Sequence, residues 1–159
     1  MEFLNSTALT YKLKNSGACE NILAIATALE DLYGVVVFTG SRAIGWDKET
    51  SDWDLVIFRP GEDYFERRLM ILTRWPKESA YYFAVSDWGS FEKDRQPYIQ
   101  SLVCDLGDRA KQNVNLIVDY RGDDPAPRWE AATDYCLEHP DECELKSDRI
   151  AIFERFGAG

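Results

Sequence analysis

This chain lacks long apolar runs and closely spaced cysteine pairs, and it has very little histidine. No apolar stretch is long enough to cross a bilayer, and the first residues, MEFLNSTALTYKLKNSG, contain neither a basic leader nor an apolar signal core. We therefore expect a cytoplasmic protein. The chain has one histidine, and its four cysteines, Cys19, Cys104, Cys136 and Cys143, include no Cys-x-x-Cys pair. We expect reduced thiols and no zinc site.

Positive charge is also scarce. The chain has 18 Lys and Arg against 28 Asp and Glu, which gives a net charge of −10. Phosphate backbones are bound by clustered Lys and Arg, so this balance argues against a broad nucleic-acid-binding surface. It still allows a small triphosphate held by a metal ion and a few local cations. It also allows a protein whose own negative charge imitates nucleic acid.

What the chain does contain is the composition of one folded domain. Hydrophobic residues make up 45% and aromatic residues 13% of the 159 residues, enough for a sizeable core. No internal repeat, low-complexity tract or evident linker divides it. We predict a single domain over residues 1–159, with a core at about 17–120 and a C-terminal helical extension at about 127–156.

Apolar periodicity predicts the order of helices and strands. The first helix follows Ser16, a plausible N-cap, and ends near Tyr33, with Gly34 closing it; nothing regular is predicted before Ser16. Further helices are expected at 62–75, at 128–138 and after Ser147. Strands are expected at 35–38, 55–58, 81–85, 98–104 and 113–120. The predicted fold class is α+β, a mixed β-sheet of about five strands packed against helices, with the C-terminal helices appended.

The stretch from Val35 to Phe58, VVVFTGSRAIGWDKETSDWDLVIF, carries the candidate site. Its first apolar run stops at Thr39-Gly40-Ser41, where the glycine allows a sharp turn. Asp52 and Asp54 stand at the start of the second apolar run. Alternate residues of a strand share a face, so these two carboxylates should project together. Because like charges repel, we expect a hard divalent cation with oxygen ligands between them.

This pattern resembles the core motif of the DNA polymerase beta-type nucleotidyltransferase superfamily, which is hydrophobic-Gly-Ser, a spacer, then Asp-hydrophobic-Asp-hydrophobic. The wording GSRAIG followed by SDWDL is especially similar to the minimal nucleotidyltransferases. SDWDL together with a strand reading NVNLIV is also similar to uncharacterised proteins of bacterial viruses. The resemblance implies a nucleotidyltransferase-like sheet and helices, and a nucleoside triphosphate as ligand.

The resemblance also implies roles for individual residues. Asp52 and Asp54 would be the catalytic ligands of Mg²⁺ or Mn²⁺. Gly40 and Ser41 would present a backbone amide and a hydroxyl to the β- and γ-phosphates. Arg42 would be a further nucleotide contact. Lys48, in the same loop, is a weaker candidate for a phosphate contact. A solvent-exposed surface charge is an equally good interpretation of Lys48.

The sequence departs from the family at the third carboxylate. Where an acid is expected, on the strand reading NVNLIVDY, the chain has Asn115. Asp119 shares its face but stands about 13 Å further along the strand. Asp105, at the end of the preceding strand, is another candidate. An amide is a poorer Mg²⁺ ligand than a carboxylate and cannot act as a general base.

Three functions follow from these observations. The first is a Mg²⁺-dependent nucleotidyltransferase that moves an NMP from an NTP to a small molecule, RNA or protein acceptor. The second is a catalytically degenerate relative that binds nucleotide or a protein partner without transfer, which Asn115 favours. The third is an acidic interaction protein that imitates nucleic acid, which only the net charge supports. No membrane partner is expected.

Overall fold

A computed structural model describes residues 7–58, 84–85, 99–105, 113–119 and 121–158, with only the backbone described for the two strands between 84 and 105. The elements are α1 (Ala8–Asn15), α2 (Glu20–Tyr33), β1 (Val36–Thr39), α3 (Gly40–Ile44), β2 (Trp53–Phe58), β3 (Ala84–Val85), β4 (Ile99–Asp105), β5 (Asn113–Asp119), α5 (Ala126–Glu138), the 3₁₀ turn η2 (Pro140–Glu142) and α6 (Lys146–Arg155).

Local capping explains where the first helices begin and end. Helix α1, which the sequence did not predict, starts at Thr7, whose hydroxyl accepts a hydrogen bond from the backbone N–H of Thr10 at 3.2 Å. The helix was not predicted because its buried face has only two apolar residues, Leu9 and Leu13, beside the polar Thr10. Helix α2 begins four residues after the expected cap and ends, as predicted, at Gly34, which has a φ of 81°.

The strands are ordered β1-β2-β5-β4-β3. β2 pairs antiparallel with β1 and parallel with β5, while β4 pairs antiparallel with both β5 and β3. The register places Asp54 of β2 between Thr39 of β1 and Asn115 of β5. Polar residues therefore lie side by side at the end of β1 and the starts of β2 and β5.

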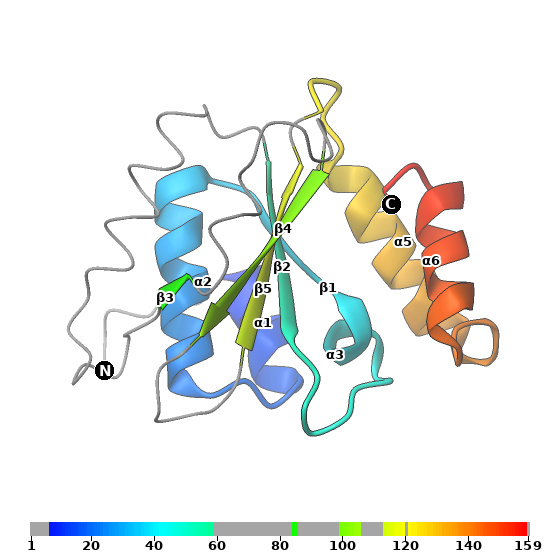
Figure 1. The fold of residues 1–159 in the computed structure, drawn as a ribbon, viewed down its shortest axis with the longest axis horizontal. Coiled ribbons are helices and arrows are strands. Elements are labelled where there is room, and N and C mark those ends of the chain that lie inside the picture. The colour runs from blue at the N-terminus through cyan, green and yellow to red at the C-terminus, as the bar shows by residue number, and fades with distance from the viewer. Residues whose placement is uncertain (1–6, 59–83, 86–98, 106–112, 120, 159) are drawn as a thin grey trace.

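Helices cover both faces of the sheet at β1, β2 and β5, as Figure 1 shows, with α1 and α2 on one side and α5 and α6 on the other. Side chains alternate between the two sides as the pleat requires. Trp53, Leu55 and Ile57 pack towards α1 and α2, whereas Val56 packs against Trp129 of α5. The site must lie on the α5 side, because Asp54 shares the face of Val56.

The predicted fold class needs correction, although the mixed α+β arrangement agrees with it. Among the described residues, the sheet packed between helices is three-stranded, β1-β2-β5, rather than about five-stranded. β4 and the two-residue β3 continue the backbone ladder at the β5 edge, whereas a strand was predicted over 81–85. An apolar run predicts a strand but not the helices that pack on it, so the sequence could not identify the three strands that the described helices cover.

The C-terminal helices are likewise not an appendage. Trp129 and Ala132 of α5 are buried against Val37 of β1, and Ile152 of α6 is buried in one cluster with Ile44 of α3. These two helices form one of the layers that sandwich the sheet.

Two further expectations have separate outcomes. The helix predicted at 62–75 and residues 81–83 of a predicted strand lie outside the described residues. Within the described ranges, none of the helices combines the length and apolar character that a bilayer crossing requires.

Candidate functional site

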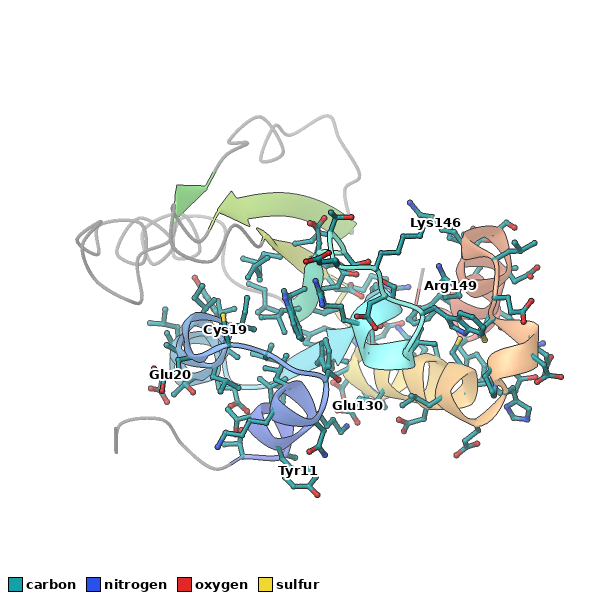
Figure 2. The ribbon with its side chains drawn as sticks, turned by 90° about the horizontal axis from the view of Figure 1, so that it is seen from below. Tyr11, Cys19, Glu20, Glu130, Lys146 and Arg149 are labelled. Atoms are coloured by element: carbon teal, nitrogen blue, oxygen red, sulfur yellow. The ribbon has the colours of Figure 1, made fainter. Side chains whose placement is uncertain are left out.

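A cleft of about 560 Å³ lies between the sheet and α6. Its floor comes from the end of β1 and the starts of β2 and β5, and its opposite wall from α5 and α6. Figure 2 shows Lys146 and Arg149 on α6. The cleft is lined by Thr39, Gly40, Ser41, Ile44, Trp46, Lys48, Thr50, Ser51, Asp52, Asp54, Asn115, Ile117, Trp129, Lys146, Arg149, Ile150 and Phe153.

Gly40 is required at the floor of the cleft for two reasons. Its φ is 80°, in the left-handed region that favours glycine. A Cβ atom built there would overlap the carboxylate of Asp54, lying 2.7 Å from its Cγ. The turn from β1 into α3 can therefore lie directly against the Asp54 side chain, and Ser41 follows at once on the cleft wall.

Asp52 and Asp54 both line the cleft, while Trp53 between them is buried on the opposite face of the sheet. The strand alternation predicted from the sequence is thus confirmed. The pKa of Asp54 is raised from 3.8 to about 6, first by burial and then by the negative charge of Asp52. A side-chain hydrogen bond with Asn115 and the positive charge of Lys146 act in the opposite direction.

Asn115 occupies the position next to Asp54 on the neighbouring parallel strand and lines the same cleft. As a hydrogen-bond donor, its amide side chain lowers the pKa of the Asp54 carboxylate. An amide can donate this bond to an ionised carboxylate without adding another negative charge. Asn115 therefore favours the ionised form of Asp54, which an acid at the same position would oppose.

Asp119 does not reach the cleft. Its carboxylate is fully buried and accepts hydrogen bonds from Arg121 Nη2 at 2.7 Å and Trp129 Nε1 at 2.8 Å. Burial opposes ionisation, but these partners hold the pKa of Asp119 below its usual value. The group is an internal ion pair that joins β5 to α5 and to the chain end, since Arg121 Nη1 also donates to the Gly157 carbonyl at 2.7 Å.

Arg42 is also absent from the cleft lining. Its guanidinium donates to the carbonyls of Ser51 at 2.8 Å and Glu49 at 3.0 Å, and lies 4.5 Å from the centre of the Trp53 ring. Only 9% of the side chain is exposed. Arg42 thus shapes the loop that leads to Asp52, whereas Lys48 of that loop lines the cleft.

The contribution of α6 to the cleft was not predicted from the sequence. Lys146, Arg149 and Ile150 face the cleft from this helix, and their spacing of three and four residues is the only sequence signal that they share a face. Arg149 Nη1 donates to the carbonyls of Cys143 and Glu144, at 2.6 and 3.0 Å, which fixes the turn before α6. Nothing in the sequence indicates that this face meets β2.

The cleft therefore opposes two carboxylates with cationic side chains. Its possible metal ligands are oxygens, from Asp52, Asp54, Asn115 and Ser41. Over the described part of the chain, no group of three or more His, Cys, Asp or Glu side chains is placed to hold a metal ion.

Comparisons with protein-family models, curated proteins and solved structures found no match to this chain. The resemblance to the nucleotidyltransferases therefore rests on the motif residues alone.

Proposed function

We propose that this protein is a Mg²⁺-dependent nucleotidyltransferase that binds an NTP in the cleft, transfers its NMP moiety to an acceptor and releases pyrophosphate. One observation carries the proposal. Two adjacent carboxylates, Asp52 and Asp54, line one cleft with the Gly40-Ser41 turn on one side and cations of α6 on the other. Binding a metal–triphosphate needs both kinds of charge in one site.

The donor set supports Mg²⁺ rather than a softer ion. Mg²⁺ is usually held by one or two carboxylates, with substrate phosphates and water completing the octahedron. Asp54 has a pKa of about 6, because burial and Asp52 oppose its ionisation, and a nearby cation would favour the ionised form. Bound Mg²⁺ would neutralise the phosphates and favour in-line attack at the α-phosphate.

The protein's own groups would bind and orient the triphosphate. The Ser41 hydroxyl lies on the cleft wall beside Gly40, and Lys48 and Lys146 approach from the loop and from α6. Lys146 replaces Arg42 in this proposal, because the guanidinium of Arg42 is used inside its own loop.

Nucleotide binding without transfer is the second candidate, and Asn115 supports it. The amide stands beside Asp54 in register, where the superfamily pattern has an acid. An amide cannot take a proton from an attacking hydroxyl. Asp105, the other candidate acid, is the last residue of β4, and its backbone pairs with that of Asn113 in β5.

The test is transfer of label from each α-labelled NTP, with Mg²⁺ or Mn²⁺ and a cell extract that supplies acceptors. Asp52→Asn/Asp54→Asn removes both cleft charges. Asp31→Asn/Asp141→Asn removes the same charge from two exposed positions outside the cleft lining, and serves as the matched control.

Label transfer that the control retains and the cleft variant loses supports the transferase. Metal-dependent NTP binding without transfer, again lost only in the cleft variant, supports the second candidate. Absence of any NTP binding to the unmodified protein rejects both.

A further inference from the structure

Two exposed apolar side chains are part of the cleft lining. Trp46 follows α3 and is 37% exposed, and Ile150 of α6 is 50% exposed. Both line the cleft. Exposed apolar side chains within a cleft that also holds convergent polar groups are typical of a ligand site.

The fold brings the two segments together and fixes them. Ile44 and Ile152, each two residues from one of the pair, belong to one buried cluster. The backbone N–H groups of Gly45 and Trp46 both donate to the Ser41 carbonyl, at 2.9 and 3.0 Å. The backbone at Trp46 is therefore anchored to the first turn of α3.

We propose that Trp46, with Ile150, forms the seat for the base of the bound nucleotide. This inference rests on the proposed function. The phosphate-binding charges lie around Asp52, Asp54 and Lys146, and a nucleotide with its phosphates there must place its base elsewhere along the cleft. A volume of about 560 Å³ accommodates a whole nucleotide.

The chemistry of the seat selects a planar aromatic ring. An indole stacks on any base, because every base has a π-face, and an aliphatic side chain packs against the opposite face. The seat therefore recognises the nucleobase as a class rather than one base.

Isothermal titration with Mg²⁺ present would compare two probes, ATP and tripolyphosphate, which share the phosphates and differ in the nucleoside. Trp46→Ala and Ile150→Ala test the seat, and Trp46→Phe keeps a stacking ring. Tyr11→Ala and Leu145→Ala are the matched controls, since these side chains are 68% and 63% exposed and do not line the cleft.

We expect Trp46→Ala to weaken ATP binding at least about fivefold, as base–aromatic stacking energies imply. Tripolyphosphate binding should change less than about twofold, and Trp46→Phe should retain most of the ATP affinity. Ile150→Ala should have a smaller effect in the same direction, and the two controls none.

Three outcomes would overturn the seat. One is that the unmodified protein binds tripolyphosphate as tightly as ATP. This result would reject the base site and would still support the phosphate site. Another is that Trp46→Ala weakens the binding of both probes equally, which would mean that Trp46 stabilises the loop and does not contact the base. If neither probe binds the unmodified protein, the proposed function fails and the seat fails with it.

Discussion

Two aspartates on one face of the sheet, Asp54 and Asp119, have opposite environments. Asp119 is fully buried, yet it is paired with Arg121 and Trp129 and its pKa is lowered. Asp54 is partly buried beside another acid, Asp52, and its pKa is raised to about 6. A buried carboxylate with its own cation stabilises a fold, whereas one left short of positive charge is a candidate for binding an external cation.

The largest expected effect is at the paired aspartate. Asp119→Ala should lower the free energy of unfolding by about 3 kcal/mol, because Arg121 loses the partner of a buried ion pair. Asp123→Ala is the control, since Asp123 also pairs with an arginine, at 2.9 Å, but is 65% exposed. We expect no measurable change there. Urea unfolding measures both, and equal losses would contradict the distinction between buried and exposed pairs.

Gly40→Ala should be the next most damaging change. A methyl group at a φ of 80° meets the Asp54 carboxylate, so we expect a loss of about 2–3 kcal/mol. Gly45→Ala has a similar φ of 93° with open space around it, and should cost only about 1 kcal/mol.

A double-mutant cycle isolates the Asp54 contact. In an Asp54→Ala background, the extra cost of Gly40→Ala over Gly45→Ala should shrink, because the overlapping carboxylate is gone. An unchanged difference would show that Gly40 is needed for some other reason.

Asp54→Asn should stabilise the protein at neutral pH. A folded-state pKa of about 6 lies above the ordinary 3.8, so the folded state binds the proton more tightly and wild-type stability falls as pH rises from about 4 through 6. We expect a gain of about 1–2 kcal/mol at pH 7.5 that disappears at pH 3, below both pKa values.

The pH dependence of the two aspartates should have opposite signs. The contribution of Asp119 is present above pH 3.8 and is lost as pH falls through its lowered folded pKa. Urea unfolding of wild type, Asp54→Asn and Asp119→Asn across pH 3–8 would show this. A gain for Asp54→Asn that does not vary with pH would contradict the raised pKa.

The smallest effect concerns Lys146. Its positive charge lowers the pKa of Asp54, so Lys146→Met should raise that pKa slightly above its present value of about 6. Lys48→Met is the control, since Lys48 lines the cleft without being among the causes of the Asp54 pKa. The carboxyl ¹³C chemical shift of Asp54, followed against pH, gives the Asp54 pKa in both variants. A larger rise of this pKa in Lys48→Met than in Lys146→Met would contradict the effect ascribed to Lys146.

Sequence reasoning predicted the parts of the site that depend on local geometry. The alternation of Asp52, Trp53 and Asp54 follows from the pleat of a strand, and the glycine turn at Gly40 follows from the need for a positive φ. It did not predict that Arg42 donates hydrogen bonds to backbone carbonyls of its own loop, or that Asp119 pairs with Arg121. These partners depend on how the loops fold back onto the rest of the chain.

The sequence by itself determined a strand–turn–strand unit with two acids on one face and an amide on a nearby strand. Only the tertiary structure decided which strands the described helices cover, which cations reach the cleft and which acid is neutralised internally. Local periodicity fixes the face on which a side chain lies, but its neighbour across the cleft depends on packing between segments far apart in the chain. The opposing Lys146 lies ninety-two residues from Asp54, and only the docking of α5 and α6 on the sheet brings it into the same cleft.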